Sequence, residues 1–136
     1  MTKKWWSGVV AALGLALAAV PALAHHAVAA QYDMNKPIEI TGSLKKMEFI
    51  NPHSMLHLEV TNADGTKVDW LFQTTNAGTL RNRGLARSGP GSLETGAKYT
   101  VKGYAARNGN PMGFLRTLIF PDGREMVFWF GDPNGN

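Results

Sequence analysis

Alternating apolar and polar positions run through the chain from residue 38 onward, which is the periodicity of β-strands. The first strand is predicted from Ile38 to Phe49, with Ile40 and Leu44 on the same face as Ile38. After two lysines the apolar positions change parity to Met47 and Phe49. A change of parity inside one long strand predicts a β-bulge or a strong bend.

The next two strands are predicted over residues 53–61 and 68–72, and together they form a hairpin. The sequence Asn-Ala-Asp-Gly between them is typical of a tight turn. A three-residue loop with Gly65 in the left-handed conformation places Val60 opposite Val68. In this register the apolar faces of the two strands coincide.

The polar face of this hairpin carries several candidate functional groups. His53, Met55, His57 and Glu59 alternate with apolar residues and therefore share this face. The predicted register sets Glu59 opposite Asp69. Such a like-charge pair is unfavourable unless a cation or water lies between the carboxylates.

The rest of the chain predicts one short helix and three further strands. Asn76, after Thr75, is a suitable N-cap for a helix over residues 77–83, and Gly84 is a suitable stop. A polar, glycine-rich loop follows. The later strands are predicted over residues 99–105, 112–120 and 125–130.

This order of elements predicts the fold class. Three strands, a short helix and two more strands form the order of an OB-type barrel. A bent first strand suits such a barrel, because it serves both halves. We therefore expect a mainly β protein with an OB-like barrel of five or six strands and one short helix. A β-sandwich is the alternative.

The N-terminus has the three parts of a secretory signal peptide. Lys3 and Lys4 precede an apolar stretch over residues 9–20, and Ala22-Leu23-Ala24 is a small-x-small cleavage pattern. A membrane span needs about 20 apolar residues, and this stretch is shorter. We expect residues 1–24 to be cleaved after Ala24 and the protein to be periplasmic, without a stable membrane anchor. Ala27-Val28-Ala29 offers a second site, after Ala29.

Cleavage sets the domain organisation and the charge of the mature chain. We expect an N-terminal arm over residues 25–37, the barrel domain over 38–130 and a frayed tail over 131–136. Losing two of the 14 basic residues leaves 12 against 10 acidic ones, a balance that argues against a nucleic-acid partner. The chain has no Cys, which excludes disulfides and thiolate metal sites. The oligomeric state stays open.

Several short motifs follow one another along the mature chain: His25-His26, Tyr32-Asp33, Lys36-Pro37, Thr41-Gly42, Asn51-Pro52-His53, Leu80-Arg81, Arg83-Gly84, Val101-Lys102-Gly103-Tyr104 and Pro121-Asp122-Gly123-Arg124. Together they resemble a family of small secreted bacterial proteins known only as a domain of unknown function. The resemblance implies export and a small β-fold, without an established activity. Members usually carry an aromatic residue where Leu85 stands, and often a bulky one such as Trp where Met55 and Leu56 stand.

The histidines support a hypothesis of metal binding. After cleavage at Ala24, His25 is the terminal residue and offers its α-amine and Nδ1 to one metal. A second imidazole, from His53, completes a three-nitrogen site that suits Cu(II), and His26 can replace or supplement it. Met55 adds a soft ligand. His57 is about 13 Å from His53 along an extended strand and is therefore peripheral.

Two functions of different classes follow. The first is a periplasmic copper carrier, buffer or sensor that uses His25, His26, His53 and Met55. The second is a metal-free periplasmic module that binds a protein or another ligand through exposed aromatic residues, with Tyr104, Trp129 and Phe130 as candidates.

Other functional readings of the sequence are weaker. No catalytic nucleophile pattern is present, so enzymatic activity is left open without support. Glu48 is interpreted as a surface charge rather than as a partner of His53. Gly103 and Gly109 are interpreted as ordinary strand and turn glycines.

Overall fold

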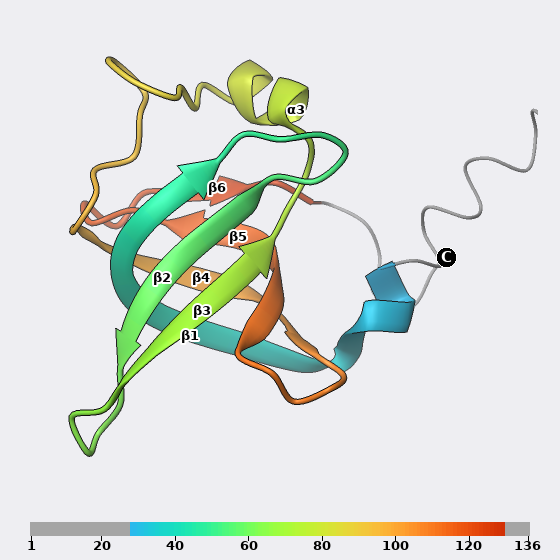
Figure 1. Cartoon of the computed structure of the whole chain (residues 1–136). Helices are drawn as coiled ribbons and strands as arrows, with labels where there is room; N and C mark the ends of the chain where they lie inside the picture. Colours follow the sequence, from blue (N-terminus) through green and yellow to red (C-terminus); the bar gives the residue numbers. More distant parts are fainter. Residues whose placement is uncertain (1–27, 130–136) are drawn as a thin grey trace, which may run out of the picture.

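The computed structural model describes residues 28–129, which contain six strands and an α-helix of six residues (Figure 1). Residues 28–31 form a single helical turn before the first strand. The predicted signal peptide and tail, together with His25, His26 and Phe130, lie outside the described residues. The elements are β1 (Tyr32–Glu48), β2 (Met55–Thr61), β3 (Lys67–Gln73), α3 (Ala77–Asn82), β4 (Lys98–Ala106), β5 (Met112–Ile119) and β6 (Glu125–Val127).

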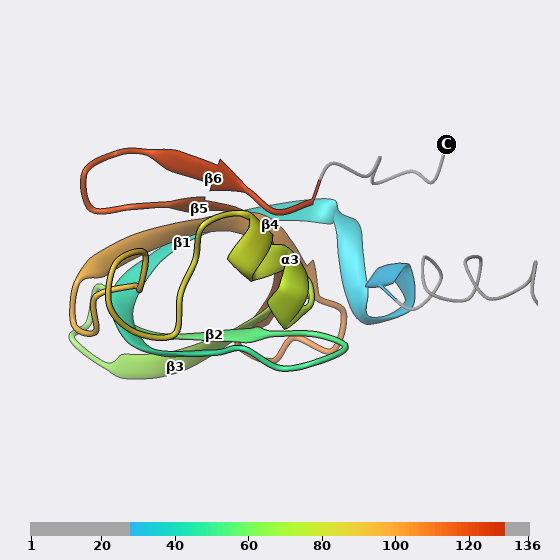
Figure 2. The ribbon, with the colours of Figure 1, turned by 90° about the horizontal axis from the view of Figure 1, so that it is seen from above.

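The strands form one sheet in the order β3-β2-β1-β4-β5-β6, and a parallel pairing of β3 with β5 closes it into a ring. This closure confirms the OB-like barrel and excludes the β-sandwich. The short strand β6 pairs with the outer edge of β5. Seen from above, α3 lies over one open end of the barrel (Figure 2). Its buried residues Ala77 and Leu80 belong to the core, so the helix closes that end.

The first strand has the predicted bulge, between Leu44 and Lys46 in its pairing with β2. The first part of β1, up to Ser43, pairs with β4, and its last part, from Ser43 to Glu48, pairs with β2 across the bulge. Its start differs from the prediction, because β1 begins at Tyr32 and part of the expected arm is strand. The reason is that only Tyr32 is buried here, against aromatic residues of other strands, so this stretch has no apolar period.

The register of the β2–β3 hairpin is the predicted one. Val60 lies opposite Val68 and Glu59 lies opposite Asp69, and Gly65 has a φ of +83°. Two cations relieve the repulsion between the carboxylates. Lys67 pairs with Glu59 at 2.7 Å and Lys45 of β1 pairs with Asp69 at 2.7 Å.

Two hydrophobic clusters stabilise the barrel. The larger fills its interior, and its most buried members include Leu56, Leu58, Phe72 and Leu115. Phe114 faces the other side of β5, because neighbours on a strand point in opposite directions.

The smaller cluster lies around Phe114 and consists of Tyr32, Tyr104 and Phe114, with Val28 and Trp129 packed against it. Tyr104 is therefore buried, contrary to the expectation of an exposed aromatic residue. This cluster joins the first described residues to the last ones.

Candidate functional site

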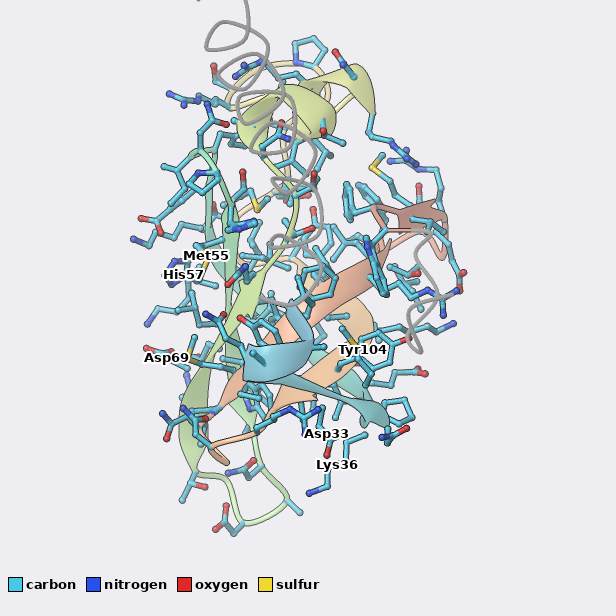
Figure 3. The ribbon with its side chains drawn as sticks, turned by 90° about the vertical axis from the view of Figure 1, so that its right-hand side faces the viewer. Asp33, Lys36, Met55, His57, Asp69 and Tyr104 are labelled. Atoms are coloured by element: carbon cyan, nitrogen blue, oxygen red, sulfur yellow. The ribbon has the colours of Figure 1, made fainter. Side chains whose placement is uncertain are left out.

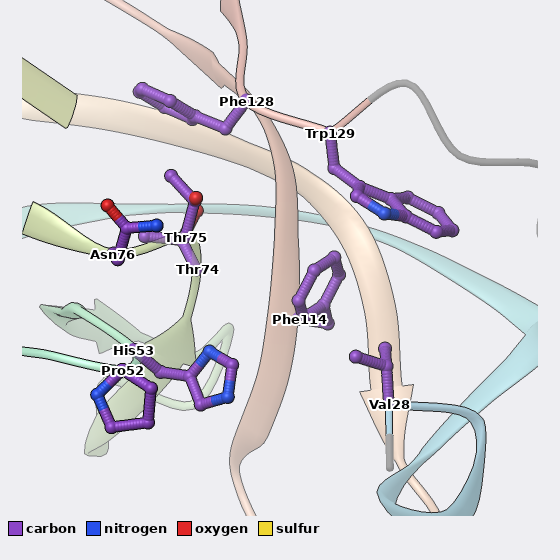
Figure 4. Close-up of a pocket in the computed structure, with 9 residues that line it drawn as sticks. All are labelled: Val28, Pro52, His53, Thr74, Thr75, Asn76, Phe114, Phe128 and Trp129. Atoms are coloured by element: carbon purple, nitrogen blue, oxygen red, sulfur yellow. The ribbon is translucent and has the colours of Figure 1, made fainter. Parts of the chain in front are cut away.

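A cleft of about 200 Å³ lies at the end of the parallel pairing of β3 with β5, where Gln73 pairs with Phe114. Its lining residues are shown in Figure 4. Much of its wall is apolar, and the polar groups lie along one side. The lining residues are Val28, Pro52, His53, Thr74, Thr75, Asn76, Phe114, Phe128 and Trp129.

His53 stands at the rim of this cleft, and its imidazole extends toward Phe114 (Figure 4). Its position is set by the next residue, Ser54, which is buried. The Ser54 amide donates to the Thr75 carbonyl at 3.0 Å, and the Thr74 amide donates to the Ser54 carbonyl at 2.9 Å. These two bonds extend the hairpin ladder by one step beyond β2 and β3. They fix the backbone beside His53 without involving its side chain.

The loop that precedes His53 is also fixed by two side-chain hydrogen bonds, from Ser54 and to Asn51. The Ser54 hydroxyl donates to the Ile50 carbonyl at 3.1 Å. The amide of Ala77, the first residue of α3, donates to the side-chain oxygen of Asn51 at 3.2 Å. The Asn51-Pro52-His53 motif thus ties the β1–β2 loop to the start of the helix. This gives the motif a structural role besides presenting His53.

The apolar wall of the cleft consists of aromatic rings packed against one another. The Phe114 and Trp129 rings meet edge to face, with centroids 5.5 Å apart and planes at 85°. Tyr104 supports Trp129 from behind at 6.2 Å, and Tyr32 supports Phe114 at 5.7 Å. The Tyr32 hydroxyl also donates to the Gln73 side chain at 3.0 Å. The wall is therefore well packed.

The N-terminal turn reaches the same cleft. Arg107 holds this turn, because its Nε donates to the Ala29 carbonyl at 2.8 Å and its amide donates to the Gln31 carbonyl at 2.9 Å. Val28 lines the cleft opposite His53 (Figure 4). The chain that carries His25 and His26 thus joins the described structure at the cleft.

Met55 and His57 lie elsewhere, on the outer face of β2 (Figure 3). Neither residue lines the cleft, so the structure does not bring Met55 and His53 together there. His57 has a partner that the sequence did not reveal, because its Nε2 donates to Glu48 Oε2 at 2.8 Å. Glu48 also accepts from Lys46 at 2.7 Å.

These contacts correct the interpretation of Glu48 as a plain surface charge. The hydrogen bond from Lys46 and then that from His57 hold the pKa of the Glu48 carboxyl below its usual value. The sequence did carry one signal of this contact. The apolar positions of the first strand change parity after Leu44, which places Lys46 and Glu48 on the same face of the sheet as His57.

Within residues 28–129, no group of three or more His, Asp or Glu side chains could hold a metal ion. No helix in that range is long and apolar enough to cross a bilayer. Among the described residues that line the cleft, His53 is the only histidine, and the lining holds no Asp or Glu.

Sequence comparison identifies the family but not an activity. A family of unknown function (DUF6152) matches residues 12–116, which include His25, His26 and His53. No curated protein is similar enough to count as a relative. The expected membership in a domain of unknown function is confirmed.

Proposed function

The chain belongs to this family of unknown function, and we propose that it is an exported, periplasmic copper-binding protein that acts as a carrier, buffer or sensor. His25, with its α-amine and imidazole, and His53 are the proposed copper ligands. His26 is an alternative ligand from the same segment. The α-amine exists only if the signal peptide is cleaved after Ala24, so export and metal binding are linked.

One observation carries the proposal: Val28 and His53 line the same cleft. Three residue steps separate Val28 from His25, and an extended chain spans at most about 3.5 Å per step. His25 is thus within about 11 Å of Val28. Among residues 28–129, none forms a hydrogen bond with the His53 imidazole, so both of its nitrogens are available.

The size and lining of the cleft also support an ion. Pockets for organic ligands usually enclose about 300–1,000 Å³, and this cleft is smaller, at about 200 Å³. An amine and two imidazoles are nitrogen donors, which Cu(II) prefers in a tetragonal plane. The rings of Phe114 and Trp129 would shield one side of the ion from water.

The first test is the mature protein, exported through its own signal peptide, with its intact mass measured before and after Cu(II) addition. We expect cleavage after Ala24 and a copper that Trp129 reports by fluorescence quenching in a Trp70→Phe background. His53→Ala or His25→Ala should weaken binding of this copper at least about tenfold, because each change removes an imidazole ligand.

The control variant is His57→Ala, which should leave the quenching of Trp129 unchanged. Cleavage after Ala29 would remove both terminal histidines and contradict the metal proposal while leaving export intact. Copper binding that neither His53→Ala nor His25→Ala changes would contradict it too.

The apolar wall favours a second candidate, a metal-free ligand-binding module. Phe114, Phe128 and Trp129 offer a hydrophobic surface beside the hydroxyl and amide groups of Thr75 and Asn76. This candidate predicts that a chain lacking residues 25–27 still binds its ligand or partner. The copper proposal predicts that the same chain no longer binds Cu(II) in the cleft.

A further inference from the structure

We propose that a hollow on the outer face of β1, β4 and β5 binds a small zwitterion such as a free α-amino acid. This outer hollow measures about 330 Å³, and Glu39, Lys102, Tyr104, Arg116 and Thr117 are among its lining residues. Its volume is within the range of pockets that hold organic ligands, about 300–1,000 Å³. None of these five residues lines the cleft beside His53, so the site does not depend on the copper proposal.

The strand register explains how these side chains meet. Two rows of cross-strand partners run over β1, β4 and β5. The first row consists of Pro37, Tyr104 and Phe114, and the second of Glu39, Lys102 and Thr117. On β1 and β4 the two rows are two positions apart, about 6.6 Å along the strand. Because members of both rows line the outer hollow, it spans the space between them.

Arg116 reaches the outer hollow from a β-bulge. Gly103 pairs with Leu115 and Lys102 pairs with Thr117, so Arg116 is an extra residue of β5 without a partner on β4. Bulges redirect side chains and are common beside functional sites. Arg116 is exposed, and its guanidinium forms no ion pair or hydrogen bond with another of residues 28–129. Its fork of N–H donors can therefore take a carboxylate in a bidentate contact.

Glu39 offers the opposite charge on the other side of the outer hollow. Its cross-strand partner Lys102 is directed elsewhere, because Lys102 Nζ lies 2.8 Å from Glu125 Oε1 on β6, which is beyond β5. Among residues 28–129 Glu39 has no ion pair within 4.0 Å. β1 and β5 are two strand spacings apart, about 10 Å. A zwitterion with its carboxylate at Arg116 and its ammonium at Glu39 satisfies both charges, whereas a simple anion or cation satisfies only one.

Two hydroxyl groups add further polar contacts. Tyr104 and Thr117 are only 5% and 7% exposed, yet neither hydroxyl forms a hydrogen bond with another described residue. Buried polar groups are nearly always hydrogen-bonded. Among residues 28–129, every side-chain oxygen or nitrogen that is shut off from solvent has a partner, so both hydroxyls must be open to solvent. Both residues line the outer hollow, where their hydroxyls are available to a polar ligand.

The test is a titration of the mature chain with L-alanine in metal-free buffer, followed by amide NMR. We expect saturable shifts of the amide signals of Glu39, Arg116 and Thr117. Propionate lacks the ammonium group and isopropylamine lacks the carboxylate. Each should bind at least about tenfold more weakly than L-alanine, because each loses one charged contact. Propionate that binds as tightly as L-alanine would refute the zwitterion site.

Variants assign the binding to the outer hollow. Arg116→Gln should weaken L-alanine binding at least about tenfold. Arg124→Gln makes the same change on the β5–β6 turn, where Arg124 lies 3.9 Å from Asp122, and it should have no effect. Tyr104→Phe should weaken binding without lowering the free energy of unfolding, because the hydroxyl has no partner among the described residues.

Unchanged L-alanine affinity in Arg116→Gln would overturn the inference. His53→Ala should keep L-alanine binding, so failure of the copper proposal and failure of this one give different results.

Discussion

Gly103 is the position at which one added methyl group is expected to disturb the barrel most. A Cβ there would lie 1.8 Å from the carbonyl oxygen of Phe114 and 3.4 Å from the amide nitrogen of Arg116. Gly103 does not have a positive φ. Alanine is therefore acceptable to the local backbone conformation, and the whole effect of Gly103→Ala is steric.

The size of the effect follows from the atoms involved. Real Cβ contacts are essentially never shorter than 3.0 Å, so the two strands must separate by more than 1 Å. The obstacle is backbone and cannot rotate away. The strain of overpacking costs about 1–3 kcal/mol, and a backbone hydrogen bond lost between β4 and β5 costs about 1–3 kcal/mol. We expect Gly103→Ala to lower the free energy of unfolding by about 2–6 kcal/mol.

The assay is urea unfolding at neutral pH, with Gly109→Ala as the matched control. Gly109 has a φ of +77° and open space around its Cβ position. Its replacement therefore costs only the left-handed backbone strain, about 1–2 kcal/mol. For a domain of about 100 residues, Gly103→Ala should also lower Tm by roughly 10–30 °C.

The comparison of the two glycine variants decides the outcome. A loss for Gly103→Ala no larger than that for Gly109→Ala would refute the reasoning, since the close approach of β4 to Phe114 would then carry no cost. Because Phe114 lines the cleft, a folded Gly103→Ala protein should also have a weakened proposed copper site.

Two further predictions concern the outer face of the barrel. Tyr32→Phe removes the hydrogen bond to Gln73 while keeping the buried ring, and it should lower the free energy of unfolding by about 1 kcal/mol, as measured by urea unfolding; a loss above about 3 kcal/mol would contradict this. The lowered pKa of Glu48 means that its pairing stabilises the fold fully above the ordinary carboxyl pKa of 4.5, and that this stabilisation is lost as pH falls through the lowered value. Glu48→Gln should therefore reduce the stability difference between pH 7 and pH 3 without abolishing it, because the pKa of Asp64 is also lowered; an unchanged difference would show that the pairing does not stabilise the fold.

Much of the barrel could be predicted because its strands alternate regularly. The bulge after Leu44 and the pairing of Val60 with Val68 both followed from the parity of apolar positions. The helix cap at Asn76 followed from local chemistry, and its side chain accepts from the Thr79 amide as expected. These features depend on a few neighbouring residues, which is why sequence reasoning reached them.

The start of β1 and the burial of Tyr104 were missed for one physical reason. Tyr32, Tyr104 and Phe114 form a cluster outside the main core, between segments far apart in the chain. No periodicity marks such a cluster, because each strand contributes only one ring to it. The cleft was missed in the same way, since its wall needs Val28, His53 and Trp129 together.

The sequence by itself determined the order of the strands, the bend in the first one, the register of the hairpin and the histidines available for metal chemistry. Only the tertiary structure decided which donors meet. It placed Val28 and His53 in the lining of one cleft, and it paired His57 with Glu48 on the outer face of the barrel. The reason is that alternation along a strand assigns each side chain to a face, whereas closure of the barrel and the bulge in β1 choose its neighbours on that face.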